Sequence, residues 1–322
     1  MFRGKAHPIT NEHGISELFQ LPLGGVKQWV YIRGQDASKP ILLMVHGGPG
    51  ASQIGFIRHF QPILEQHFVV VNWDQRGSGM SYTRSIPNGS MTVQHFVDDI
   101  IMLTKYLCDR FKHEKIYMAA HSWGSIIGLM AVHQRPALFY KYFGIAQMAN
   151  YAENERISYY RLLEKARRKK HMKAVEKLTG IGKPPWNEWK HERVLSKYLN
   201  LLGGGMSRDG KLLKALIKHV IQSPEYKLGD YFRYLMGLIF SKKALRQELS
   251  KIDLISTVQK VDIPIYFLMG RHDLTVPPEP VKELFDSIEA KEKQWIWFEE
   301  SAHSPLFEET EKFSRMLKEN KE

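Results

Sequence analysis

Two kinds of segment alternate along the first half of the chain and limit the folds that it can adopt. Short apolar runs rich in β-branched and aromatic residues are expected strands at 15–21, 26–32, 40–46, 68–73 and 116–120. Residues 94–111, between two of these strands, and residues 124–134, after the last of them, carry apolar residues at helical spacing. Because strands that alternate with helices form parallel sheets covered on both faces, the pattern predicts an α/β fold with a mostly parallel central sheet flanked by helices.

The alternation stops in the middle of the chain and returns near its end. Residues 150–254 are helical in pattern and interrupted by Gly and Pro, with 161–178 the clearest helix. Beyond them strands are expected at 263–269 and 294–298, and helices at 278–288 and 305–318. We therefore divide the chain into a first core part, 1–149, a helical insert, 150–254, and a second core part, 255–322.

The net charge of the chain lies entirely in the helical insert. The whole sequence has a formal charge of +12, and residues 151–255 alone hold 23 Lys and Arg against 11 Asp and Glu. Such asymmetry indicates a separate unit, which we interpret as a lid over the edge of the sheet. Its basic face is either a solvated surface or attracts anionic substrates or membranes by steering. No nucleic-acid recognition motif accompanies the charge, so nucleic-acid binding is not expected.

Composition narrows the class of protein further. With 322 residues, 43% of them hydrophobic, the chain can bury a large core. Cys108 is the single cysteine, which excludes an internal disulfide and a zinc site of several thiolates. No apolar run approaches the roughly 18 to 20 residues that span a bilayer, and no secretory signal pattern is present. We expect a cytoplasmic protein without membrane contact, and no metal cluster, dinucleotide loop or phosphate loop indicates a cofactor.

Three polar residues follow expected strands and together supply a nucleophile, an acid and a base. Ser122 follows the strand at 116–120, and Asp273 and His303 follow the two strands of the second core part. The carboxyl ends of parallel strands lie along one edge of a sheet, where α/β proteins place their sites. The order Ser, Asp, His is that of serine hydrolases built on an α/β sheet. We predict that His303 activates Ser122 and that Asp273 orients the imidazole.

The residues around Ser122 fit a sharp turn between a strand and a helix. Such a turn needs small residues two positions before and after the nucleophile, and these are Ala120 and Gly124. The usual pattern has glycine at the first of them. Taken alone, a serine at such a position is more often a helix cap than a nucleophile, and an aspartate in a loop is more often a turn residue or a cap. The three residues in this order and context favour the catalytic interpretation.

A glycine-rich loop, HGGPG at residues 46–50, follows the expected strand at 40–46. Acyl transfer develops negative charge on a carbonyl oxygen, and backbone N–H groups aimed at that oxygen stabilise it. Glycines present such groups without obstruction by side chains. We assign the oxyanion donors to the N–H groups of Trp123 and Gly48, with Gly47 as the alternative to Gly48.

The HGGPG loop, together with WDQRGSGMS at 73–81 and SWGS at 122–125, resembles the proline iminopeptidase branch of the α/β-hydrolase superfamily. The resemblance covers about two thirds of the chain. It implies an α/β-hydrolase fold with an inserted cap and an enzyme that releases N-terminal residues, preferably proline, from small peptides. By the same resemblance Ser122, Asp273 and His303 form the catalytic triad, and Asp74 and Arg76 are structural.

The substrate stays open at this point. Recognition of a protonated α-amine calls for carboxylates that reach in from the insert, and Glu153 and Glu155 near its start are the candidates. A carboxylesterase or another hydrolase of small acyl compounds would use the same triad. An epoxide hydrolase or dehalogenase is disfavoured because it needs a carboxylate nucleophile at the position of Ser122. A binding protein without catalysis is disfavoured because it would not need a triad. The sequence does not determine the oligomeric state.

Overall fold

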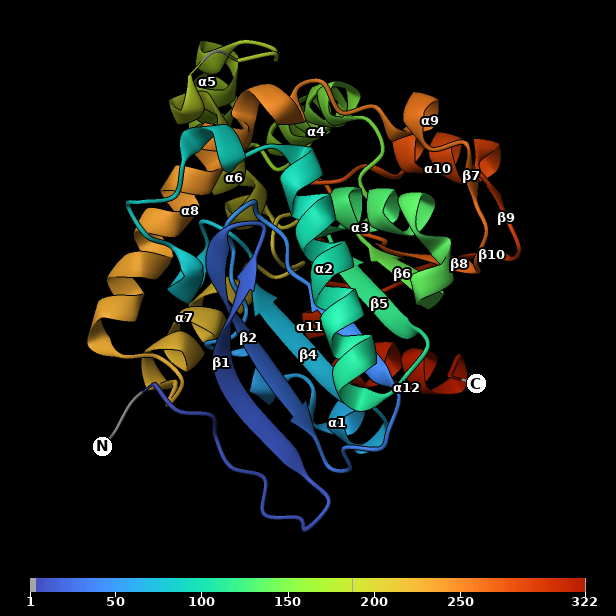
Figure 1. Ribbon diagram of the computed structural model, residues 1–322. Helices are drawn as coiled ribbons and strands as arrows, with labels where there is room; N and C mark the ends of the chain where they lie inside the picture. The colour runs from blue at the N-terminus through green and yellow to red at the C-terminus, as the bar shows by residue number, and fades with distance from the viewer. Residues whose placement is uncertain (1–3, 187, 322) are drawn as a thin grey trace.

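One eight-stranded sheet forms the centre of the computed structural model, which describes residues 4–186 and 188–321 (Figure 1). The strand order is β1-β2-β4-β3-β5-β6-β8-β10. β1 pairs antiparallel with β2 and β2 with β4, and all other pairs are parallel. The strands are β1 (Ile15–Leu23), β2 (Val26–Gly34), β3 (Ile41–Val45), β4 (Val69–Asp74), β5 (Ile116–His121), β6 (Phe139–Ile145), β8 (Ile265–Gly270) and β10 (Lys293–Phe298). This arrangement confirms the predicted α/β class and the mostly parallel sheet.

Strand β6 is a part of the sheet that the sequence analysis does not predict. It lies between β5 and β8 and pairs with both in parallel. Its sequence, FYKYFGI, is aromatic, but Tyr140 is exposed while Lys141 is buried with only 8% exposure. This order breaks the alternation of apolar and polar residues that marks a half-buried strand.

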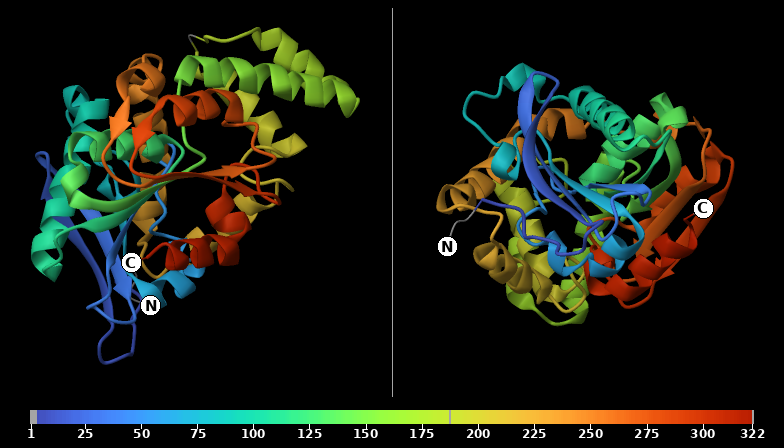
Figure 2. Two further views of the ribbon diagram at one scale, coloured as in Figure 1. Left: turned by 90° about the vertical axis from the view of Figure 1, so that its right-hand side faces the viewer. Right: turned by 60° about the horizontal axis from the view of Figure 1, so that its bottom comes forward.

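Helices cover both faces of the sheet, and the alternation of side chains along each strand divides the core into two clusters. In β3, Leu43 packs with the cluster under α2 (Val93–Phe111), α3 (Trp123–Gln134) and α10 (Pro278–Ser287). Its neighbour Leu42 packs with the cluster on the other face. That face is covered by α1 (Pro62–His67), α11 (Pro305–Glu308) and α12 (Thr310–Glu319) (Figure 2).

Helices α4 to α8 lie between β6 and β8, and we call residues 151–249 the helical segment. They are α4 (Tyr151–Arg168), α5 (Met172–Ile181), α6 (Trp189–Leu202), α7 (Leu212–Gln222) and α8 (Leu228–Leu249). Helices α4 to α6 share an apolar cluster of their own, which includes Leu162, Leu178 and Leu199. In the left view of Figure 2, α4 extends outward beyond the sheet.

The two ends of the helical segment are joined by backbone hydrogen bonds. The N–H of Tyr151 donates to the carbonyl oxygen of Ile252 at 3.0 Å, and the N–H of Leu254 donates to that of Ala149 at 2.7 Å. A short helix, α9 (Leu254–Thr257), and a small parallel pair, β7 (Lys260–Val261) with β9 (Glu289–Ala290), follow. The chain therefore leaves the core and returns to it at neighbouring points.

The expected single helix at 161–178 is wrong. α4 ends at Arg168 and α5 begins at Met172, with Lys170 at a φ of 52° between them. A left-handed residue ends a helix, and Arg167, Arg168, Lys169 and Lys170 repel one another if they continue on one helix. In the described part of the chain, no helix combines the length and the apolar character needed to cross a membrane.

Candidate active site

Ser122 occupies the turn between β5 and α3. Its φ of 54° and ψ of −120° are strained for a residue with a side chain, as in a nucleophile turn. Gly124 makes the turn possible, because a Cβ there would lie 2.5 Å from the carbonyl oxygen of Val45. Ala120, where the usual pattern has glycine, faces Gly128, whose own Cβ would lie 2.8 Å from that of Ala120. The space that the alanine needs is thus provided by a glycine one turn into α3.

Ser122, His303 and Asp273 form one chain of hydrogen bonds. His303 Nε2 lies 2.9 Å from Ser122 Oγ, and His303 Nδ1 lies 2.8 Å from Asp273 Oδ2. The other carboxylate oxygen of Asp273 accepts from the N–H groups of Thr275 at 2.7 Å and Val276 at 2.9 Å. All three side chains are nearly buried, at 9%, 6% and 3% exposure respectively. A carboxylate held in this way fixes the imidazole with its free nitrogen toward the serine hydroxyl.

His121 supports the loop that carries His303. Its Nε2 lies 2.7 Å from the carbonyl oxygen of His303. Burial, followed by the nearby imidazole of His303, lowers the pKa of His121 to about 3. The ring is therefore neutral and donates a hydrogen bond to that carbonyl. No role for His121 follows from the sequence, because its contact depends on a residue distant in the chain.

The glycine-rich loop lies beside Ser122. A Cβ on Gly47 would lie 3.1 Å from the Cβ of Ser122, and Gly48 has a φ of 123°, a conformation that favours glycine. Trp123 is the first residue of α3, so its N–H has no acceptor within the helix. Both glycines and Trp123 line the same cavity as Ser122. The predicted oxyanion donors and their alternative are therefore adjacent to the nucleophile.

Gln75 connects this loop to the start of α3. Its side-chain amide donates to the carbonyl oxygen of His46 at 2.8 Å and accepts from the indole Nε1–H of Trp123 at 2.9 Å. Gln75 is fully buried, so both bonds lie outside water. The WDQRG sequence thus contributes a residue that holds the two halves of the proposed oxyanion site in register.

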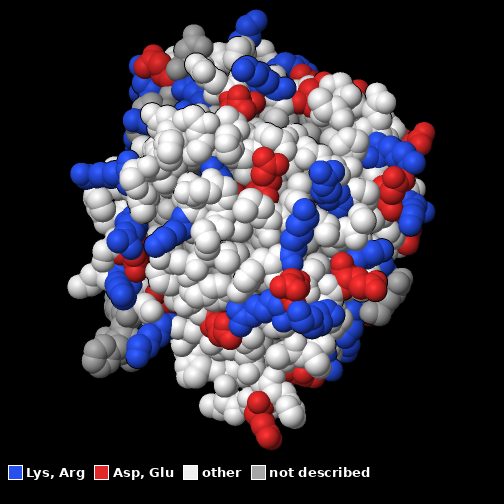
Figure 3. Space-filling model, viewed as in Figure 1, with Lys and Arg blue, Asp and Glu red and all other residues white. Residues whose placement is uncertain are grey.

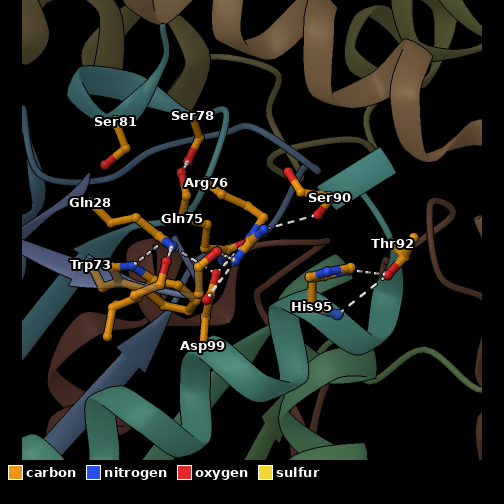
Figure 4. A network of polar contacts seen from close by, with 12 residues as sticks. Gln28, Trp73, Gln75, Arg76, Ser78, Ser81, Ser90, Thr92, His95 and Asp99 are labelled. Carbon is orange, nitrogen blue, oxygen red and sulfur yellow. Dashed lines mark hydrogen bonds and ion pairs between the residues drawn. The ribbon is translucent and has the colours of Figure 1, made fainter. Parts of the chain in front are cut away.

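The neighbouring Arg76 belongs to a buried network away from the cavity (Figure 4). Its guanidinium donates to both carboxylate oxygens of Asp99 at 2.7 Å. Asp99 also accepts from Gln28 at 2.7 Å, and Gln28 accepts from the indole of Trp73 at 2.9 Å. Arg76 and Asp99 are both fully buried. The network joins β2, β4 and α2, which accords with the structural role expected for Arg76.

Asp74 has a similar place in the fold. It is fully buried and accepts hydrogen bonds from the hydroxyl of Ser52 and, at 2.8 Å, from the N–H of Met80. Burial raises the pKa of Asp74 to about 7, against the lowering effect of the bonds from Ser52 and Met80. Its contacts tie the end of β4 to the loops on either side of it.

A cavity of about 710 Å³ opens in front of Ser122, and we call it the Ser122 cavity. His303 and the glycine-rich loop line its floor, and side chains of α4, α6, α7 and α8 line its walls. Most of the wall residues from α7 and α8 are apolar, among them Leu216, Ile217, Leu235 and Leu238. The cavity therefore offers an apolar surface to a substrate that reaches the nucleophile.

Charged groups stand on one wall of the Ser122 cavity. Glu155 of α4, Glu192 of α6, and Lys242 and Arg246 of α8 all line it, and Arg246 lies 3.0 Å from Glu192. Burial and the charge of Glu192 raise the pKa of Glu155 to about 7, although a hydrogen bond from Tyr151 and the charge of Arg246 oppose this. Burial in the cavity wall also lowers the pKa of Lys242.

The two carboxylates proposed from the sequence lie in different surroundings. Glu155 faces the cavity, whereas Glu153 is half exposed and forms an ion pair with Arg156 at 2.6 Å, outside the lining. Glu192 also lines the cavity, although it is not one of the carboxylates proposed from the sequence. Its approach to Glu155 depends on the packing of α6 against α4, which no local pattern encodes.

The sequence matches one protein family along most of its length. The profile described as serine aminopeptidase, S33, matches residues 36–310. The chain belongs to the serine aminopeptidase family S33. The chain is 40% identical over 309 residues to the probable aminopeptidase YbaC of Bacillus subtilis, covering 96% of this chain and 97% of that protein. It is 24% identical to a proline iminopeptidase of Clostridioides difficile, over 93% of this chain and 96% of the relative.

Solved structures share the fold of this S33 family member. A proline iminopeptidase-related protein from Thermus thermophilus superposes with a TM-score of 0.65 at 21% identity, covering 95% of this chain and 96% of that one. A 2-hydroxy-6-oxo-6-phenylhexa-2,4-dienoate hydrolase from Rhodococcus superposes with a TM-score of 0.64 at 18% identity, covering 95% of this chain and 98% of that one. These likenesses confirm the expected α/β-hydrolase fold.

Proposed function

We propose that this S33 family member is a serine hydrolase of aminopeptidase type that releases N-terminal residues from small peptides. The observation that carries the proposal is the hydrogen-bonded chain from Asp273 through His303 to Ser122, which ends in a cavity that also holds the carboxylate of Glu155. The similarity to a probable aminopeptidase over nearly the whole chain supports the same conclusion. We further propose that the helical segment acts as a lid that shapes the cavity and limits water.

The reaction proceeds through an acyl-enzyme. Ser122 Oγ attacks the scissile carbonyl carbon while His303 Nε2 takes the hydroxyl proton, and Asp273 stabilises the imidazolium that forms. The N–H groups of Trp123 and Gly48, or Gly47 in its place, donate to the oxyanion. His303 then gives its proton to the leaving amine, and the C–N bond breaks. A water molecule, deprotonated by His303, attacks the ester and releases the N-terminal residue and Ser122.

Glu155 supplies specificity for a free α-amine. Ionised Glu155 attracts the ammonium group of the substrate, and Glu192 adds a second carboxylate on the same wall. Arg246 already pairs with Glu192, so Glu155 is the carboxylate with more capacity for a cationic ligand. Glu153 has no part in this site because its partner is Arg156.

The apolar wall of the Ser122 cavity favours a second candidate function. Leu216, Ile217, Leu235 and Leu238 would accommodate the acyl chain of an ester as well as an apolar residue of a peptide. A carboxylesterase would use the same triad without any contribution from Glu155. The proposed chemistry needs no cofactor and takes a small peptide or acyl compound as its substrate.

A substrate panel separates the two functions. The enzyme is assayed with proline and alanine arylamides, with the same arylamides blocked by N-acetylation, and with short-chain aryl esters. An aminopeptidase cleaves the free-amine arylamides and loses most of its kcat/KM when the amine is blocked. Cleavage of aryl esters alone would support the esterase instead. Ser122→Ala, with its melting temperature as a control for folding, removes both activities and labelling by a fluorophosphonate if Ser122 is the nucleophile.

A further inference from the structure

Apolar side chains project into solvent from one side of α7 and α8. On α7 they are Leu213, Ile217 and Ile221, each four residues from the next, which we call the α7 stripe; their exposed fractions are 43%, 52% and 56%. On α8 they are Leu228, Phe232, Leu235 and Ile239, which we call the α8 stripe, exposed by 79%, 57%, 59% and 42%. These spacings place each set on a single helix face. Water-exposed patches of this kind mark interaction sites.

The two stripes continue into the Ser122 cavity. All three residues of the α7 stripe and Leu235 of the α8 stripe also line the cavity. The apolar surface outside is therefore the rim of the cavity mouth rather than an isolated patch. Whatever covers the rim also covers the entrance to the proposed nucleophile.

The exposed charges of residues 211–243, the segment that carries both stripes, are basic. Residues 211–243 contain seven Lys and Arg, and their two acidic residues are Glu225 and Asp230. Both acidic side chains are buried, with 0% and 4% exposure. On α7, the exposed Lys214 and Lys218 directly border the stripe. At the left edge of the molecule in Figure 3, where α8 runs in Figure 1, Lys and Arg side chains outnumber Asp and Glu.

We propose that the α7 and α8 stripes dock on an anionic phospholipid surface, so that the Ser122 cavity opens toward the bilayer. Apolar side chains that enter the boundary between headgroups and acyl chains, with lysines reaching to anionic headgroups, are the pattern of an interfacial helix. A second copy of the chain fits this face poorly, because a two-fold interface would bring the same lysines together. The proposal departs from the sequence-based expectation of no membrane contact, and it does not depend on the identity of the substrate.

Vesicle binding by the full chain tests the proposal. The protein is sedimented with vesicles of phosphatidylcholine containing phosphatidylglycerol, and separately with phosphatidylcholine alone. We expect binding to the anionic vesicles that weakens when the salt is raised from about 0.1 M to about 1 M, because the Debye length falls from about 10 Å to about 3 Å. Equal binding to both vesicles without dependence on salt, or no binding to either, would overturn the proposal.

Variants outside the cavity separate docking from catalysis. The triple variant Leu228→Ser/Phe232→Ser/Ile239→Ser changes three exposed residues that do not line the cavity. It should lower the partition coefficient of the protein between anionic vesicles and water by about tenfold or more. The double variant Lys214→Gln/Lys218→Gln should reduce the dependence of vesicle binding on salt concentration. Met102→Ser/Met172→Ser, at exposed positions on α2 and α5, is the matched control and should bind like the wild type.

Two further measurements identify the other outcomes. Hydrolysis of a soluble aryl ester by the triple serine variant should equal that of the wild type, since none of the three residues belongs to the site. An enzyme that binds vesicles but hydrolyses nothing would contradict the proposed function and leave docking in place. A dimer in the absence of lipid, detected by analytical ultracentrifugation and dissociated in the triple variant, would overturn docking in favour of a contact between copies.

Discussion

The indole of Trp123 donates a hydrogen bond to the side-chain oxygen of Gln75 at 2.9 Å, and the same amide group donates to the carbonyl of His46. Through these two bonds a residue just beyond β4 links the loop that carries Gly48 to the first residue of α3. The N–H groups proposed to bind the oxyanion come from these same two elements. We therefore propose that Gln75 is a positioning residue for the site rather than a catalytic one.

Replacement of Gln75 by Met should lower kcat by about tenfold or more while KM for an aryl ester changes little. The variant loses both bonds and leaves the indole N–H and the His46 carbonyl unpaired, so we also expect a loss of about 1–3 kcal/mol in the free energy of unfolding. Trp123→Phe, which keeps the backbone donor and the bond from Gln75 to His46, should have the smaller effect on kcat. Equal kcat values for wild type and Gln75→Met would refute the positioning role.

Asp273→Asn should lower kcat by about three to four orders of magnitude with little change in folding. The amide can still accept from Thr275 and Val276, but its NH₂ group faces His303 Nδ1 and favours the wrong tautomer. Single-turnover kinetics on an aryl ester measures the loss, and circular dichroism checks the fold. Activity within tenfold of the wild type would remove Asp273 from the mechanism.

The pH dependence of KM should distinguish substrates with a free amine from blocked ones. The pKa of Glu155 is raised to about 7, so its carboxylate is ionised above pH 7 and gains a proton as the pH falls through that value. The neutral form does not attract an ammonium group, and KM for a free-amine arylamide should rise by about tenfold as the pH falls below 7. KM for a neutral aryl ester should show no such change.

Glu155→Gln supplies the control for this pH effect. Its KM for the free-amine arylamide should be high at every pH, and its kinetics on the aryl ester should match the wild type. The matched variant Glu153→Gln, in the surface pair with Arg156, should behave as the wild type with both substrates. If the two variants prove indistinguishable, Glu155 does not recognise the amine.

Loss of the buried ion pair between Arg76 and Asp99 should destabilise the protein strongly. Asp99→Leu leaves the guanidinium without a countercharge in a fully buried position, which should lower the free energy of unfolding by about 3–5 kcal/mol in urea titrations. Glu17→Gln removes a partner from the half-exposed pair with Arg110 and should cost less than about 1 kcal/mol. Arg76→Met/Asp99→Leu should recover most of the loss, since no unpaired charge remains.

The sequence predicts the positions of Ser122, Asp273 and His303 because each depends on a local signal, a polar residue just after an apolar strand. A parallel sheet then brings such residues to one edge without further information. Strand β6 is missed because buried Lys141 and exposed Tyr140 reverse the usual pattern of burial. The break between α4 and α5 is missed because the apolar residues on either side of the run of four basic residues keep a common helical spacing.

Glu192 and His121 lie beyond the reach of local patterns for a different reason. Glu192 reaches Glu155 through the packing of α6 on α4, and His121 contacts a residue 182 positions away in the chain. Contacts of this kind depend on how whole elements pack, so they appear only in three dimensions. Glu153 and Glu155 are separated for a simpler reason, because residues two positions apart on one helix point to nearly opposite sides.

The hydrogen bonds that join Ala149 to Leu254 and Tyr151 to Ile252 make the helical segment a closed excursion from the core. The segment also supports the loops of the site, because the N–H of His303 donates to the carbonyl oxygen of Gly205 at 3.1 Å and that of Leu274 to Gly204 at 2.9 Å. Helices there can therefore be lengthened, exchanged or remodelled without disturbing the alignment of Ser122 with His303 where these supporting bonds are kept. The substrate cavity can then change while the proposed catalytic residues keep their places, and a graft that keeps both the anchors and the acceptors at Gly204 and Gly205 is a rational route to new selectivity.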